Sequence, residues 1–400
     1  MFKSLSLKVI IFGFIFTFFS SFGQSFFLGL FNSSIRDTLS ITQGQFGTIY
    51  ASATLLSSFL LIWVGKKIDD INIFKFAFFV TLLLSFSCFF FSKISSIAFL
   101  FIAIFLMRFS GQGMMSHTAT TTISRYFTKS RGKALSTSWF GLSTAEFILP
   151  VLIVYLLTIT AWQNIWVSIS ILVLIFLPIT SFALVKNLNF DSREETKKED
   201  NKNIKQWKRI DVLKDYRFYV VCLNMLAMPW IATGVFVYQS FITESKDWGT
   251  FVIAQSFMVY SILSVITLLV SGFLIDKFTS RKLLIFMNIP LLFSTLVLIF
   301  FHNPLTSFIF LGLIGISNGL ANVLGSSTWA EIYGVKHIGS IKALTTALMV
   351  FSTAFGTALF GLLIDKGYSI EQIAFVSSTY IFLSIALLFF VRNKLNPQYI

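Results

Sequence analysis

Residues 108–150 read RFSGQGMMSHTATTTISRYFTKSRGKALSTSWFGLSTAEFILP, and the interpretation of the whole chain starts from them. Two apolar stretches, rich in glycine and threonine, flank a short basic segment at residues 125–133. Each stretch carries one full charge far from its ends, Arg108 in the first and Glu146 in the second. A charge at such depth in a lipid-embedded helix costs at least a few kcal/mol, so it usually faces an aqueous cavity or a partner. These two residues are therefore the leading candidates for a functional site.

The composition places the whole chain in a membrane. Of its 400 residues, 56% are hydrophobic and only 12% are charged, more apolar surface than the core of a soluble domain absorbs. Only helices or closed barrels can cross a bilayer, and the apolar segments are too long and too uniform to be barrel strands. The predicted fold class is an all-α membrane protein.

Runs without Asp, Glu, Lys or Arg mark most of the membrane spans directly. Seven such runs are residues 9–35, 38–65, 76–92, 218–243, 248–275, 343–364 and 372–391. Residues 94–124 form another span that only Arg108 interrupts. The region after Lys133 breaks at residues 160–164, and the run 283–330 breaks at 302–304, where a proline starts a new helix. We therefore expect twelve transmembrane helices.

The twelve helices divide into two halves. We expect a six-helix bundle at residues 1–186, a polar cytoplasmic linker at 187–215, and a second six-helix bundle at 216–400. A short amphipathic helix is predicted near residues 204–213 of the linker. The halves share short motifs at offsets of 206 to 209 residues: Gly65-x-x-x-Asp69 with Gly272-x-x-x-Asp276, Gln112-Gly113 with Asn318-Gly319, and Lys133-Ala134-Leu135 with Lys342-Ala343-Leu344. This repetition predicts two halves in the same orientation, as in a rocking transporter.

The net charge of +14 is explained by orientation in the membrane rather than by nucleic-acid binding. With a cytoplasmic N-terminus, the outer loops hold only four of the 31 basic residues: Arg36, Lys93, Lys246 and Lys366. Apart from Arg108, the other 26 then lie on the inner side. We therefore expect both termini in the cytoplasm. Trp162, Trp166 and Trp248 fall near the outer interface, where aromatic belts are expected.

Several motifs resemble those of the major facilitator superfamily, and the resemblance covers nearly the whole chain. Residues 65–69, GKKID, are similar to the signature of the loop between helices 2 and 3, although Asn72 and Ile73-Phe74 depart from it. Residues 272–282, GFLIDKFTSRK, are a better preserved copy between helices 8 and 9. Arg108-x-x-Gly111-x-Gly113 resembles the helix 4 arginine motif. Residues 131–134, RGKA, are similar to the branch of monocarboxylate and oxalate/formate carriers, and residues 22–27 and 46–50 look like bacterial members.

The resemblance implies a gate at the inner ends of helices 2 and 8. It places Asp69 near Gly339-Ser340 and Asp276 near Gly132, each carboxylate beside a helix N-terminus of the opposite half. Such a contact contributes typically about 0.3–1 kcal/mol and would favour the outward-open state. Gly65, Gly272 and Arg281 belong to the same loops, and both glycines are expected to let helix ends pass their neighbours. Alternatively, these aspartates are loop charges that only set topology.

Three interpretations of Arg108 and Glu146 stay open. They could form a static buried ion pair, which is often near neutral for stability. Glu146, the only acid at this depth in either half, could carry a coupling proton. Arg108 could bind the carboxylate of an organic anion, because its planar guanidinium suits bidentate contacts. His117 could relay protons, although a lone helix histidine is more often a hydrogen-bonded core residue.

Other polar side chains are candidates for a substrate cavity. Helices 1, 4, 7 and 10 line the central cavity in the superfamily, and they carry Gln24, Asn32, Gln112, Asn224, Tyr238, Gln239, Asn318 and Asn322. The alternative is that they make hydrogen bonds between helices, which polar side chains commonly do in membranes.

The sequence contains no Walker P-loop, dinucleotide fingerprint, metal-ligand cluster or serine triad order, so we expect no cofactor, no metal and no enzyme activity. We expect a monomeric secondary active transporter in the bacterial cytoplasmic membrane, working by alternating access on a small organic anion such as a monocarboxylate. Its expected partners are that small molecule, the lipid bilayer and, as the candidate coupling ion, protons. The alternatives are an efflux carrier for drugs or metabolites, a non-transporting membrane sensor, or a lipid-modifying enzyme.

Overall fold

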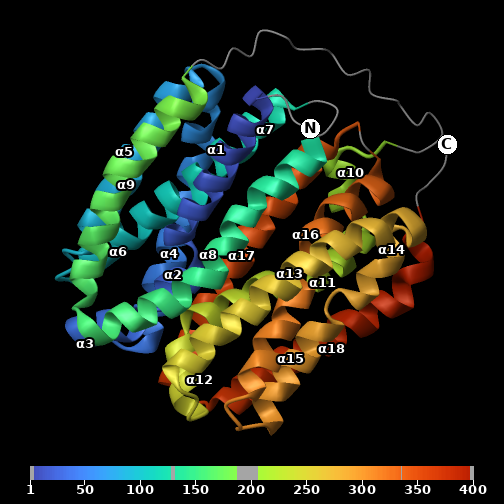
Figure 1. The fold of residues 1–400 in the computed structure, drawn as a ribbon. Coiled ribbons are helices and arrows are strands. Elements are labelled where there is room, and N and C mark those ends of the chain that lie inside the picture. Colours follow the sequence, from blue (N-terminus) through green and yellow to red (C-terminus); the bar gives the residue numbers. More distant parts are fainter. Residues whose placement is uncertain (1–3, 128–130, 187–205, 335, 397–400) are drawn as a thin grey trace. The chain divides into compact units, whose positions relative to one another are not determined.

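The computed structural model describes residues 4–127, 131–186, 206–334 and 336–396 (Figure 1). All regular elements in these ranges are helices, and twelve of them are long and apolar enough to cross a membrane. The predicted fold class and the predicted number of spans are both confirmed. The chain separates into two compact units, Met1–Thr196 with Phe236–Ser240, and Lys197–Val235 with Phe241–Ile400.

The first unit contains α1 (Ser4–Ser20), η1 (Ser21–Gly23), α2 (Ser25–Gly29), α3 (Asn32–Leu39), α4 (Gln43–Val64), η2 (Gly65–Asp69), α5 (Ile73–Phe91), α6 (Ile97–Met107), η3 (Arg108–Met115), α7 (Ser116–Tyr126), α8 (Arg131–Ile159) and α9 (Trp162–Val185). Local polar residues start several of these helices. Thr42 and Gln45 form a capping box before α4, and the side chains of Asn72 and Ser96 cap α5 and α6.

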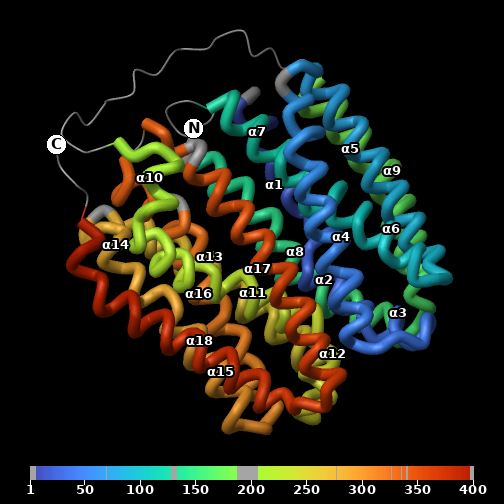
Figure 2. Tube along the Cα trace, turned by 180° about the vertical axis from the view of Figure 1, so that it is seen from behind, coloured from blue at the N-terminus to red at the C-terminus, as the bar shows by residue number. Residues whose placement is uncertain are grey.

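Two close helix pairs organise this unit. α1 lies along α8, and α5 lies along α9, a pairing that both views show (Figures 1 and 2). The Thr17 hydroxyl donates to the Ser138 carbonyl at 2.5 Å. A Cβ at Gly141 would lie 2.0 Å from the Phe14 carbonyl oxygen, so only glycine permits this approach of α8 to α1.

The tryptophans expected at the outer interface are buried in the described structure. Trp166 has no exposed surface, and its ring contacts those of Phe27, Phe31 and Phe91. Trp248 is also buried and donates its indole N–H to the His302 carbonyl. These side chains therefore pack between helices, which the hydropathy of the sequence does not distinguish from an interfacial position.

The second unit contains α10 (Arg209–Leu213), α11 (Tyr216–Val237, whose last residues belong to the first unit), α12 (Gln239–Ser245), α13 (Thr250–Phe278), α14 (Ser280–Leu283), η4 (Leu284–Phe286), α15 (Ile289–Phe300), α16 (Thr306–Tyr333), α17 (Ile338–Asp365), α18 (Ile370–Val391) and η5 (Arg392–Lys394). α13 packs along α16, and α15 along α18 (Figure 2). Gly315 and Gly319 allow this close packing, because a Cβ there would meet the carbonyls of Tyr260 and Ser264 at 2.3 and 2.5 Å.

The packing repeats between the units. The third and sixth spans pair in each, as α5 with α9 and as α15 with α18. The second and fourth spans also pair in each, α4 with α6 and η3, and α13 with α16. The internal repeat in the sequence thus corresponds to two six-helix bundles of the same topology. Of the predicted linker, residues 187–205 lie outside the described residues, and the described part contains the short helix α10 within the range expected, 204–213.

Candidate functional site

Arg108 begins a π-helical segment in the middle of the fourth span. The segment η3 has wider turns than an α-helix, a feature that is rare and frequent at functional sites. It contains Gly111 and Gly113, and a Cβ at Gly111 would lie 2.7 Å from the Gly23 amide nitrogen. Because these glycines have no side chain, η3 lies close enough to the first span for Arg108 to reach it.

The guanidinium of Arg108 is 3% exposed and is held by the first two spans. Its Nε donates to Thr54 Oγ1 at 3.2 Å, and Nη1 donates to the Gly23 carbonyl at 3.0 Å and to Ser25 Oγ at 3.3 Å. The Tyr50 ring lies beneath it at 5.3 Å, and the Tyr50 hydroxyl donates to Ser25 Oγ. Among the described residues, Nη2 has no hydrogen-bond partner, so one donor group of the fork is unused.

The carbonyl that Arg108 binds lies where the first span breaks. α1 ends at Ser20, a short 3₁₀ turn follows, and Gln24 is extended (φ −82°, ψ 153°) before α2 begins. An interrupted helix leaves backbone carbonyls without their helical donors. Arg108 supplies a charged donor to one of them, at Gly23, and so fastens the break in the first span to the fourth.

Glu146 lies on α8 at the depth of this break. Gly13 and Thr17 of α1 pack against Ser138 and Gly141 of α8, so the two helices run parallel. Glu146 is five residues beyond Gly141, about 7.5 Å along the helix, which brings it level with η1. Its side chain is 7% exposed, and no hydrogen bond or ion pair to it occurs within the described residues.

Arg108 and Glu146 do not form a static ion pair in the described structure. Both η3 and α8 pack against η1, whereas η3 and α8 have little direct contact with each other. The first span therefore contacts both segments, while the fourth and fifth spans contact each other through α7 and α8. Their similar depth still brings the two groups to the same segment, residues 21–25.

The side chain of His117 contacts Gly65, one of the gate candidates. Its Nε2 lies 3.0 Å from the Gly65 carbonyl, at the end of α4, and the side chain is half-buried. A Cβ at Gly65 would lie 3.3 Å from that ring, so the glycine does accommodate a neighbouring helix as expected. At Gly272, by contrast, nothing among the described residues comes within 4 Å of a Cβ.

The cavity candidates of the first unit separate into two groups. Gln24 and Gln112 are half-buried, and their side chains make no hydrogen bond to the rest of the described chain. Asn32, Tyr238 and Gln239 instead bind backbone, with Asn32 donating to Val237, Tyr238 to Gln43, and Gln239 to Phe26. These bonds hold Phe236–Ser240 within the first unit, which is the packing role that was the alternative for them.

The candidates of the second unit differ in exposure. Asn224 is completely buried, its carbonyl accepts from Asn288, and its amide group has no partner among the described residues. Asn318 donates to Ser264 Oγ at 2.9 Å, and Asn322 is exposed. The neighbouring helices cover Asn224 in this structure, and its part in a substrate cavity stays a prediction.

The gate residues are only partly described. The surroundings of Asp69, Gly132 and Asp276 lie outside the described residues. Arg281 Nε forms an ion pair with Glu331 Oε1 at 2.8 Å, and Glu331 Oε2 accepts from the amides of Ser280 and Arg281 and from the Ser280 hydroxyl. We call this set of Ser280, Arg281 and Glu331 the Arg281–Glu331 junction.

Sequence reasoning missed several residues of these sites. Thr54, Ser25 and Tyr50 hold Arg108 from 54 to 83 positions away, and their residue types are common throughout the chain. Glu331 could have been singled out from the sequence, because it is an isolated acid at the end of the tenth span. Its partner Arg281 lies in the second copy of the loop signature.

The close approach at Gly23 leads to a testable expectation. In Gly23→Ala the new Cβ would lie 2.3 Å from the Met107 carbonyl oxygen and 2.4 Å from the Gln112 amide nitrogen. Both atoms are backbone, so the helices must separate, and we expect a loss of about 1–3 kcal/mol or more in stability. Thermal unfolding of the purified protein measures it. Gly325→Ala, with nothing described within 4 Å, is the control, and equal midpoints for both variants would contradict the packing at Gly23.

Comparison with known proteins places this geometry among transporters. A family model described as the Major Facilitator Superfamily matches residues 13–264 and 220–398. A bacterial homologue of the human lysosomal transporter Spinster, inward-facing and unoccupied, has a TM-score of 0.74 at 11% identity, over 99% of this chain and 98% of its own. The nucleoside transporter NupG has a TM-score of 0.70 at 13% identity, over 98% and 99%. No curated protein sequence matches at a significant level. Identities this low establish a shared fold and say nothing of substrate.

Proposed function

The chain belongs to the Major Facilitator Superfamily, and from that premise we propose that it moves a small organic anion by proton-coupled alternating access. It is a multi-pass membrane transporter rather than an enzyme. Substrate class and coupling ion are the proposed parts, and they are supported by the chemistry around η1.

The unused Nη2 donor of Arg108 is the observation that carries the substrate class. Three of its hydrogen bonds are made by protein oxygens, while Nη2 is left without a partner among the described residues. A buried guanidinium with an unused donor favours a carboxylate over a neutral solute, because charge-assisted hydrogen bonds are about twice as strong as neutral ones. A monocarboxylate is the smallest substrate that meets this requirement.

Glu146 supports proton coupling. The segments of the first span packed against α8, α1 beyond Lys8 with η1 and α2, carry no titratable side chain, and neither does α9. The titratable residues of α7, which also packs on α8, are His117, Arg125 and Tyr126, of which His117 binds Gly65. A carboxyl group with no fixed counter-ion can bind or release a proton with little rearrangement. It therefore suits a transporter in which this group is protonated during one half of the cycle.

The remaining parts of the proposal concern location. The distribution of Lys and Arg supports a bacterial cytoplasmic membrane orientation with both termini inside. We propose a monomer, and we retain the monocarboxylate and oxalate/formate carriers as the nearest branch on the strength of residues 131–134.

A ligand screen on the purified protein tests the substrate class. Monocarboxylates are expected to raise the thermal midpoint, because a ligand that binds only the folded state stabilises it by an amount that grows with the logarithm of its concentration above Kd. Nucleosides and hydrophobic drugs form the comparison panels. Uptake of the stabilising carboxylate into proteoliposomes should then saturate. Stabilisation by nucleosides or drugs alone would reject the organic anion.

A further inference from the structure

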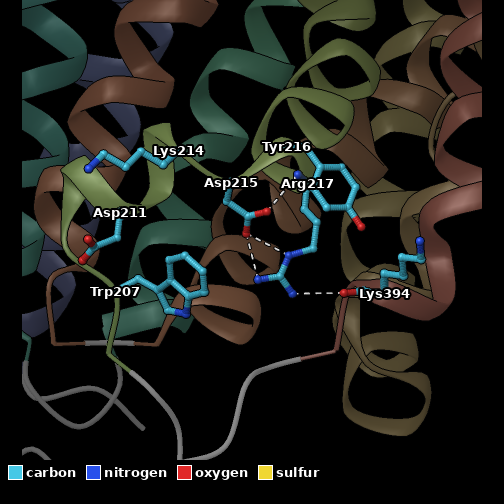
Figure 3. A pocket seen from close by; sticks show the side chains of 7 residues that line it. All are labelled: Trp207, Asp211, Lys214, Asp215, Tyr216, Arg217 and Lys394. Atoms are coloured by element: carbon cyan, nitrogen blue, oxygen red, sulfur yellow. Dashed lines mark hydrogen bonds and ion pairs between the residues drawn. The ribbon is translucent and has the colours of Figure 1, made fainter.

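The second unit holds a buried ion pair whose role the proposed transport cycle leaves unassigned. Arg217 Nε and Nη2 both lie 2.8 Å from Asp215 Oδ2, and each side chain is only 6% exposed (Figure 3). The Arg217 amide also donates to Asp215 Oδ1 at 3.0 Å. Desolvating two charges this far requires further hydrogen bonds, so the other partners of the pair indicate what it holds together.

One set of partners joins the end of the linker to α16. The rings of Trp207 and Tyr333 lie 5.5 and 6.0 Å from the Arg217 guanidinium. The Tyr333 hydroxyl donates to Asp215 Oδ2, and the Trp207 amide donates to the Tyr333 carbonyl at 3.1 Å. The start of α11, the linker end and the last turn of α16 are therefore bound to one centre.

The other partners belong to the segment after α18. Arg217 Nη1 donates to the Lys394 carbonyl at 3.0 Å, as Figure 3 shows, and to the Asn396 carbonyl at 3.1 Å. Between them the Leu395 side chain is completely buried. The side-chain oxygen of Asn396 accepts a hydrogen bond from Arg281 Nη1. Asn396 thus bridges two arginines, Arg217 through its main chain and Arg281 through its side chain.

These contacts connect the buried pair to the Arg281–Glu331 junction by two routes. The first route is α16, where Glu331 of the junction and Tyr333 of the buried cluster lie two residues apart. The second route is Asn396. The cluster also borders an open pocket of about 390 Å³, which is large enough to admit water.

We propose that Arg217, held by Asp215, is a positioning residue for the Arg281–Glu331 junction and acts on it through Tyr333 and Asn396. The cluster sets how firmly Glu331 holds the amides of Ser280 and Arg281. Loosening it changes how often the junction opens and therefore the rate of the conformational step. Substrate affinity stays the same, since no residue of the cluster is a candidate substrate ligand. The effect on transport rests on the proposed function, whereas the effect on the junction does not.

Two variants test the route through Asn396. Asn396→Ala removes the acceptor for Arg281 and leaves the buried pair intact, while Arg217→Lys keeps a charge for Asp215 but loses the fork that reaches two carbonyls. Asn393→Ala is the matched control, because its side chain makes no hydrogen bond in the described structure. Amide hydrogen exchange of residues 279–283 reads the junction directly, since two of its amides donate to Glu331.

We expect amide exchange in residues 279–283 to be about five-fold faster in both variants and unchanged in Asn393→Ala. Turnover in proteoliposomes should fall about three-fold with KM unchanged. Wild-type exchange rates in Asn396→Ala would overturn the proposal, and this variant decides alone if Arg217→Lys does not fold. Faster exchange in a protein that transports no anion would support the positioning role and count only against the proposed substrate.

Discussion

Replacement of Arg108 by lysine is expected to weaken the apparent affinity for an anionic substrate by about 10- to 100-fold. The lysine keeps the charge but has one ammonium group in place of the fork that reaches Thr54, Gly23 and Ser25 together. If the ammonium group binds the Gly23 carbonyl at the break in the first span, this single compact group cannot also reach the position where Nη2 would bind the substrate carboxylate. Losing one charge-assisted hydrogen bond costs about 1.5–3 kcal/mol, which corresponds to this range in affinity.

Concentration-dependent uptake into proteoliposomes measures the change as an increase in KM. Tyr50→Phe is the control, because it keeps the ring beneath the guanidinium and removes only the hydroxyl bonded to Ser25. We expect that variant to stay within about three-fold of wild type. An unchanged KM in Arg108→Lys would show that the guanidinium of Arg108 does not bind substrate.

Replacement of Glu146 by glutamine is expected to abolish accumulation driven by a pH gradient. Glutamine has nearly the same shape and cannot bind or release a proton in this pH range. The side chain has no partner among the described residues, so the variant should fold and express like wild type. Exchange of labelled for unlabelled substrate, which needs no net proton movement, should persist.

The measurement compares uptake across a series of imposed pH differences. Glu244→Gln serves as the control, since Glu244 is an exposed acid of the second unit. The control should keep the wild-type response. A Glu146→Gln variant that still accumulates substrate in proportion to the pH difference would remove Glu146 from coupling.

The spans could be predicted because hydropathy is a local property of the chain. Each run without charges is long enough to cross the bilayer by itself, and motifs at one constant offset revealed the repeat. Arg108 and Glu146 could be singled out for the same reason, since a charge inside an apolar run is costly wherever it points. Their partners could not be predicted. Serine, threonine and tyrosine occur throughout the chain, and nothing local marks Ser25, Thr54 and Tyr50 as the residues that meet Arg108.

The sequence by itself determined the class, the number of spans, the internal repeat and the two charges around which a transport site is proposed. Tertiary structure alone decided that the first span breaks at residues 21–24, that Arg108 binds the freed Gly23 carbonyl instead of Glu146, and that Trp166 is buried. It also decided that Arg217 and Arg281 meet at Asn396. The physical reason is that burial in lipid depends on the residues within one segment, whereas hydrogen-bond partners depend on which helix faces meet.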